Sequence, residues 1–130
     1  KLFGFGPDTF GILTWPFRQD SIDTYGVFFE SAHNEYFQYL VTMGPFTMIA
    51  YILFLVSSCA RMFRYAKVQP WILAPLGATV CYGAQALVNI NLPIATPVMW
   101  ALLAVGLAMC KNASETAKGL DKQETAVQNQ

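Results

Sequence analysis

The chain has 130 residues, of which 55% are hydrophobic and only 12% are charged, and its formal net charge is zero. A soluble domain covers its surface mainly with Lys, Arg, Asp and Glu, yet the stretch from Val68 to Cys110 contains none of these residues. The composition therefore excludes an ordinary soluble domain. It predicts an all-α polytopic membrane protein whose partner is the lipid bilayer, and we expect no nucleic-acid partner.

Residues 1–35 are predicted to form an extracytoplasmic loop with short helices, because turn-forming glycines and prolines alternate there with aromatic side chains. Arg18 is the only arginine in this loop. Its planar guanidinium group can clamp a phosphate, or it can pair with Asp20 or Asp23. Both interpretations stay open, so Arg18 is a candidate substrate-binding residue.

Apolar and polar stretches alternate over the rest of the chain, and roughly 20 apolar residues in a helix suffice to cross the ~30 Å hydrocarbon layer of a bilayer. The loop after the first run carries Arg61, Arg64 and Lys67 and no acid, which places it in the cytoplasm by the positive-inside rule. Residues 1–35 then lie outside. In chain order we predict a membrane helix over 36–60 with a kink at Gly44-Pro45, a basic cytoplasmic loop over 61–70, a membrane helix over 71–88, an outer turn over 89–93, a membrane helix over 94–110 and a disordered cytoplasmic tail over 111–130.

Two amide side chains lie near the outer end of the second of these membrane helices. Gln85 and Asn89 are four residues apart, which puts them on one face of a helix. Polar groups at that depth usually face other helices or a water-filled cavity. We therefore expect them either to join helices by hydrogen bonds or to line a substrate cleft.

The only histidine of the sequence, His33, lies just before the uncharged run from Tyr36 to Ala60, where water is expected to meet lipid. If Glu30 is on the same helix, it is three residues from His33 and four from Asn34, so the three side chains share a face. A carboxylate beside an imidazole can orient the ring for proton transfer. The residues alone leave a functional role and a purely interfacial role for His33 equally open.

The surroundings of His33 resemble a known family. His33-Asn34, nine further residues and then Gly44-Pro45-Phe46-Thr47 resemble the motif of the bacterial O-antigen ligase and polymerase-like membrane proteins. In that family a histidine followed by Asn, Ser or Gln precedes a glycine at this spacing. The upstream stretch Gly4-Phe5-Gly6-Pro7-Asp8-Thr9-Phe10 resembles the Gly-x-Gly-x-x-Thr-Phe turn found before that histidine. We therefore expect the chain to be the C-terminal portion of a larger protein with many helices.

The resemblance implies a glycosyltransferase at the outer face of the bacterial cytoplasmic membrane. Such an enzyme moves a glycan from an undecaprenyl diphosphate donor to a sugar hydroxyl acceptor, with no cofactor and no metal. By the same resemblance His33 is the catalytic base that takes the proton from the acceptor hydroxyl, and Arg18 is the one outer arginine present to hold the diphosphate. Ligase and polymerase share this pattern. The further candidate substrate-binding residues are Glu30, Asn34, Gln85 and Asn89.

Two other classes of protein remain alternatives. In the first, the chain is a small three-helix membrane protein that acts as a non-catalytic assembly or binding subunit, and His33 is an interfacial or pH-sensing residue. In the second, it is part of a transporter. The second is disfavoured because no charged residue inside the predicted membrane helices marks an ion path.

Overall fold

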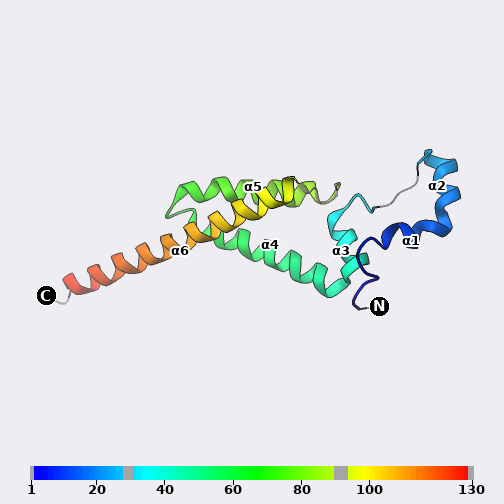
Figure 1. The fold of residues 1–130 in the computed structure, drawn as a ribbon. Coiled ribbons are helices and arrows are strands. Elements are labelled where there is room, and N and C mark those ends of the chain that lie inside the picture. The colour runs from blue at the N-terminus through cyan, green and yellow to red at the C-terminus, as the bar shows by residue number, and fades with distance from the viewer. Residues whose placement is uncertain (1, 28–30, 90–93, 129–130) are drawn as a thin grey trace. The chain divides into compact units, whose positions relative to one another are not determined.

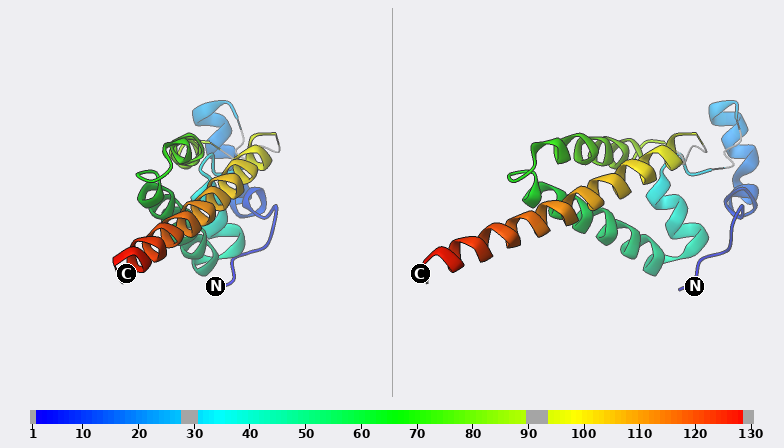
Figure 2. Two further views of the ribbon diagram at one scale, coloured as in Figure 1. Left: turned by 90° about the vertical axis from the view of Figure 1, so that its left-hand side faces the viewer. Right: turned by 60° about the vertical axis from the view of Figure 1, so that its left-hand side comes forward.

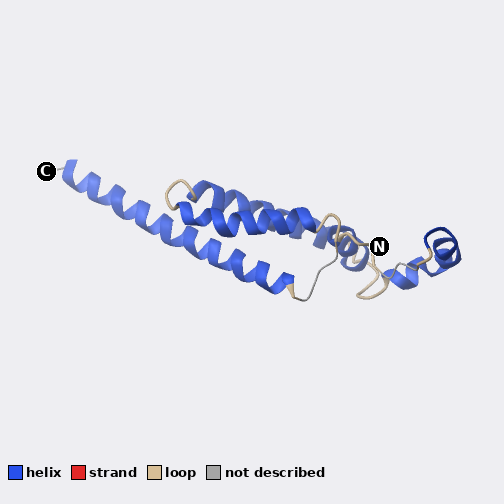
Figure 3. Ribbon diagram, turned by 90° about the horizontal axis from the view of Figure 1, so that it is seen from above, coloured by secondary structure: helices blue, strands red, loops and turns tan. Residues whose placement is uncertain are grey.

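The computed structural model describes residues 2–27, 31–89 and 94–128, with side chains described up to residue 119, and every regular element in these ranges is a helix (Figure 1). The view coloured by secondary structure, Figure 3, shows these helices and the loops that join them. The expected all-α fold is confirmed. The elements are α1 (Phe10–Thr14), η1 (Trp15–Phe17), α2 (Arg18–Tyr25), α3 (Glu35–Met43), α4 (Pro45–Tyr65), η2 (Pro70–Ile72), α5 (Leu73–Gln85) and α6 (Ala95–Gln128).

The chain divides into two compact units. The first comprises Lys1–Phe54 together with Gly83–Leu92, and the second comprises Leu55–Tyr82 together with Pro93–Gln130. His33 and the beginning of α3 belong to the first unit, whereas the basic residues at the end of α4 belong to the second.

The segment predicted as one kinked membrane helix over 36–60 is two helices. α3 ends at Met43, Gly44 adopts φ +88° and ψ 171°, and α4 begins at Pro45. The chain changes direction at this point (Figure 1). A residue before proline is disfavoured in the helical region, and proline is well suited to the first position of a new helix. The expected kink is therefore a complete break.

The N-terminal segment stabilises this break. The N–H groups of Phe5 and Gly6 donate to the carbonyls of Val41 and Thr42, both at 2.9 Å. These carbonyls belong to the last turn of α3, where the helix itself supplies no donors. The close approach depends on Gly4, which has φ +71° and at which a Cβ would collide with the backbone of Thr42.

Two helices of the described chain are long and apolar enough to cross a membrane. They are Pro45–Tyr65, with 21 residues, and the stretch Ala95–Gly119 of α6, with 25 residues. Their apolar side chains are largely exposed, as at Phe46 (62%) and Leu53 (61%). α5 has only 13 residues and is not among these candidates. Two candidate spans therefore stand where three were expected.

The C-terminal segment is a helix as far as it is described. α6 runs unbroken from Ala95 to Gln128, as both views of Figure 2 show. The prediction of a disordered tail over 111–130 is wrong up to Gln128. Ala, Lys, Glu and Gln dominate this stretch and are good helix formers, and Glu115 is spaced to support the helix with both Lys111 and Lys118.

The core of the second unit lies where α4, α5 and α6 meet. Gly106 of α6 is buried there, and a Cβ on it would collide with Met62 and lie 3.1 Å from the side chain of Pro75. Tyr82 and Thr96 join α5 to α6 through their hydroxyls, 2.7 Å apart. Because Gly106 has no side chain, the helices can approach closely at that position. The largest fully buried side chains of the described chain are Met62, Ile72, Leu103 and Cys110.

Candidate functional site

His33 stands where the chain enters α3. Residues 31–34 are not helical, and His33 is exposed with φ +45°, in the left-handed region. That backbone costs an ordinary residue about 1–2 kcal/mol, so contacts elsewhere must hold it. Because α3 begins only at Glu35, the helix face predicted to be shared by Glu30, His33 and Asn34 does not exist. Glu30 itself lies outside the described residues.

Two hydrogen bonds fix the residues on either side of His33. The N–H of Ala32 donates to Gln38 Oε1 at 3.1 Å, which ties the preceding loop to α3. Asn34 Oδ1 accepts from the N–H of Phe37 at 2.9 Å, as expected of a residue that caps the beginning of a helix. The backbone before and after the imidazole is therefore anchored to the same helix.

Three consecutive residues at the beginning of α3 donate hydrogen bonds to carbonyls at the C-terminal end of α5. The bonds run from Asn34 Nδ2 to Leu87 at 2.9 Å, from the Glu35 N–H to Ala86 at 2.8 Å and from the Tyr36 hydroxyl to Gly83 at 2.8 Å. Gly83 is in the last turn of α5, where carbonyls lack partners within the helix, and Ala86 and Leu87 belong to the turn that follows it. The beginning of α3 carries the positive end of its dipole and meets the negative end of α5, which is a favourable arrangement.

The first residue of α3, Glu35, carries a buried carboxylate. Glu35 is only 2% exposed, and the hydroxyl of Tyr51 in α4 donates to its Oε1 at 3.0 Å. A buried charge requires such donors. The ring of Tyr51 also packs against Tyr39 in a T-shaped contact with 5.0 Å between centroids and against Tyr36 at 6.0 Å. Together these side chains join α3 to the first half of α4.

Tyr36 lies in α3, outside the two candidate membrane spans. Burial raises the pKa of the Tyr36 hydroxyl above its ordinary value, and the nearby carboxylate of Glu35 raises it further. The hydroxyl donates to the carbonyl of Gly83.

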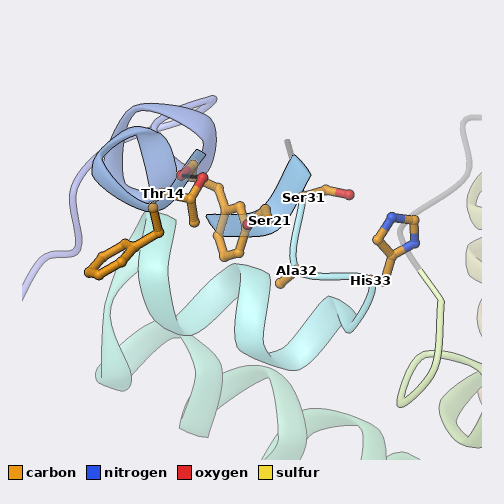
Figure 4. A pocket seen from close by; sticks show the side chains of 7 residues that line it. Thr14, Ser21, Ser31, Ala32 and His33 are labelled. Carbon is orange, nitrogen blue, oxygen red and sulfur yellow. Dashed lines mark hydrogen bonds between the residues drawn. The ribbon is translucent and has the colours of Figure 1, made fainter. Parts of the chain in front are cut away.

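A pocket of about 340 Å³ lies beside His33 in the first unit. Its volume falls within the range of about 300–1,000 Å³ that is usual for small-molecule sites. Figure 4 shows Thr14 and Ser21 on one side of the pocket and Ser31 on the other, with His33 at the rim and its imidazole directed away from Thr14 and Ser21. The pocket is lined by Phe10, Thr14, Phe17, Ser21, Ser31, Ala32 and His33.

Arg18 is not among the residues that line this pocket, although its neighbour Phe17 is. Arg18 begins α2, and its guanidinium carbon lies 4.7 Å from the centre of the Trp15 ring. That distance is typical of a cation–π contact. Asp23, one of the two acids considered as its partner, accepts a hydrogen bond from Gln19 at 3.0 Å.

Gln85 and Asn89 do not share a helix face. α5 ends at Gln85, and the chain then forms a turn in which the N–H of Val88 donates to the Gln85 carbonyl at 3.0 Å. Asn89 follows that turn, so the four-residue spacing does not apply to it. Neither amide lines the pocket beside His33.

Glu35 and Tyr51 are the residues of this region that the sequence interpretation missed. A signal existed for Glu35, since an acid that immediately precedes 25 uncharged residues is costly to bury without a donor. No comparable signal existed for Tyr51. Its place beside Glu35 depends on a complete break at Gly44, where the sequence indicated only a kink.

Comparison with protein-family models, with curated proteins and with solved structures gives no match. The resemblance to the O-antigen ligase family therefore rests on the motif residues around His33 and Gly44. Within residues 2–27, 31–89 and 94–119, no group of three or more His, Cys, Asp or Glu side chains is placed to hold a metal ion.

Proposed function

We propose that this chain is part of a membrane glycosyltransferase similar to the O-antigen ligases and polymerases, with His33 as its general base. The observation that carries the proposal is the setting of His33. Its imidazole is exposed, its backbone is left-handed, and it lies at the rim of a pocket lined by hydroxyls and aromatic rings. Residues held in such strained conformations cluster at functional sites.

In the proposed reaction the imidazole of His33 accepts the proton of an acceptor sugar hydroxyl. The acceptor oxygen then forms a bond to the anomeric carbon of the donor sugar, and the bond from that carbon to the undecaprenyl diphosphate breaks. The hydroxyls of Thr14 and Ser21 are suited to bind sugar hydroxyls. The rings of Phe10 and Phe17 are suited to pack against the apolar face of a sugar. Arg18, next to Phe17 in the chain, is the candidate contact for the diphosphate.

The distribution of charge supports an outer position for this pocket. In the first unit, five acids stand against two bases, counted over residues 1–54 and 83–92. The end of α4 and the loop after it carry only bases. By the positive-inside rule we assign the inner end of α4 to the cytoplasm and His33 to the extracytoplasmic side of a bacterial cytoplasmic membrane, with α4 as a spanning helix.

The test is transfer of glycan from a lipid-linked donor in cells that carry the intact protein with His33→Ala or His33→Gln. General base catalysis contributes about 10²–10⁴-fold, so we expect both variants to lose at least two orders of magnitude of transfer at unchanged membrane abundance. Thr116→Ala is the matched control, because Thr116 is exposed on α6 and bonds only locally to Asn112. Full transfer by either His33 variant would exclude the proposed role.

One observation favours the non-catalytic assembly subunit as a second candidate function. Along α4, apolar side chains spaced three and four residues apart are exposed, at Phe46 (62%), Ile49 (49%), Leu53 (61%) and Val56 (60%). Such a stripe suits a partner helix as well as lipid. Undiminished transfer by the His33 variants would make this candidate the better one.

A further inference from the structure

A second pocket, of about 390 Å³, lies at the far end of α4 in the second unit. The residues that line it all belong to α4, and they include polar and cationic side chains. The uncharged run of α4 ends at Ala60, so this pocket begins at the point where the helix stops being apolar. The lining residues are Ser57, Ala60, Arg61, Arg64 and Tyr65.

Helical spacing aligns the functional groups of this pocket on one outward stripe. Ser57, Arg61 and Arg64 stand at positions i, i+4 and i+7, which share a face. The adjacent face of α4 is the packed one, since Met62 is fully buried and Ser58 is 5% exposed. Arg61 and Arg64 are both exposed. Their guanidinium groups are therefore accessible from the surface while the helix that carries them is held by its other side.

Bases outnumber acids among the described side chains of the second unit. Over residues 55–82 and 93–119 of the second unit there are five bases and one acid. The bases are Arg61, Arg64, Lys67, Lys111 and Lys118, and the acid is Glu115.

We infer that this pocket binds the phosphate group of an anionic phospholipid. Arginine is the side chain best shaped for phosphate, because its planar fork donates two parallel hydrogen bonds. Basic residues next to a membrane helix attract anionic headgroups. The negative end of the α4 dipole opposes an anion here, so the two arginines must carry the binding. The inference does not depend on the role of His33.

The test uses the full chain in detergent, titrated with phosphatidylglycerol or phosphatidylcholine, with bound lipids counted by native mass spectrometry. We expect phosphatidylglycerol to bind preferentially, and R61A/R64A to lower its affinity roughly tenfold or more. The control K111A/K118A removes the same number of charges from α6 and is expected to change the affinity less than about twofold. R61K/R64K keeps the charge but loses the fork, and we expect it to bind clearly more weakly than the wild type.

The outcomes separate the possibilities. Any one of three results would overturn the inference. These are no preference for phosphatidylglycerol, an equal loss of affinity in R61A/R64A and K111A/K118A, and wild-type affinity in R61K/R64K. A selective loss on changing the arginines supports it. Inorganic phosphate, added against chloride of matched ionic strength, then identifies the source. Displacement of the lipid would show that the site also takes phosphate from solution, and its absence would show that the site takes the lipid-borne phosphate.

Discussion

Replacement of Asn34 by alanine removes two hydrogen bonds with one substitution. Asn34 Oδ1 accepts from the N–H of Phe37 at 2.9 Å, and Nδ2 donates to the carbonyl of Leu87 at 2.9 Å. Loss of an N-cap costs about 1 kcal/mol, and loss of one further hydrogen bond costs about 1 kcal/mol. We therefore expect Asn34→Ala to lower the free energy of opening the first turn of α3 by roughly 2 kcal/mol.

Asn34→Ser is the matched variant, because serine caps a helix about as well as asparagine but cannot reach Leu87 with an amide. It is expected to cost only about 1 kcal/mol. Hydrogen exchange of the first α3 amides, measured by mass spectrometry after labelling of the intact protein, reports the destabilisation in both variants. Since 1.4 kcal/mol is a factor of ten, exchange at Phe37 should rise about 30-fold in Asn34→Ala and about fivefold in Asn34→Ser.

Amides of α6 within residues 95–119 serve as the internal control and should exchange at unchanged rates. Wild-type exchange at Phe37 in Asn34→Ala would refute the idea that this residue holds α3 to the end of α5. Equal exchange in the alanine and serine variants would show instead that the bond to Leu87 carries the whole effect and that the cap contributes nothing.

Two further substitutions test the packing of the first unit by thermal unfolding. Gly44→Ala should destabilise the protein by roughly 2–5 kcal/mol, because Gly44 has φ +88° and a Cβ would collide with the N-terminal backbone. The control Gly77→Ala, at an open position inside α5, should instead stabilise the protein by about 1 kcal/mol. A Gly44→Ala protein as stable as the wild type would contradict the close approach. Tyr51→Phe should cost about 1.5–3 kcal/mol by removing a donor to the buried carboxylate of Glu35, whereas Tyr25→Phe, at a side chain 68% exposed, should cost almost nothing. Similar melting temperatures for these two tyrosine variants would refute the importance of the Tyr51–Glu35 bond.

Helix ends were the least predictable part of the fold. The sequence pattern merged α3 and α4 because all residues from Tyr36 to Ala60 are uncharged, and charge alone does not show where a helix breaks. The break at Gly44 is stable because the N-terminal segment bonds to the end of α3. After α5 ends at Gln85, the N–H groups of Leu87 and Val88 turn back to the carbonyls of Ala84 and Gln85, and residues 34–36 bond to the carbonyls of Gly83, Ala86 and Leu87.

The candidate site was partly predictable. His33 was identifiable from its uniqueness and its place before an apolar run, and Asn34 from its position beside it. The helix expected to include His33 begins only at Glu35, after the left-handed residue His33, and Glu30 lies outside the described residues. Nothing in the spacing of Thr14 and Ser21 indicated that they share a pocket with a residue more than ten positions further along the chain.

The sequence by itself determined the helical class and the contrast between an acidic first unit and a basic end of α4, because composition and charge act residue by residue. It predicted three membrane helices, whereas the described chain has two helices long and apolar enough to cross a membrane. Only the tertiary structure decided where α3 begins and ends, which groups bond to the turn after α5 and how Glu35 is buried. These features depend on hydrogen bonds between segments up to 53 residues apart, such as that from Asn34 to Leu87. Local pattern carries no information about a donor that far along the chain.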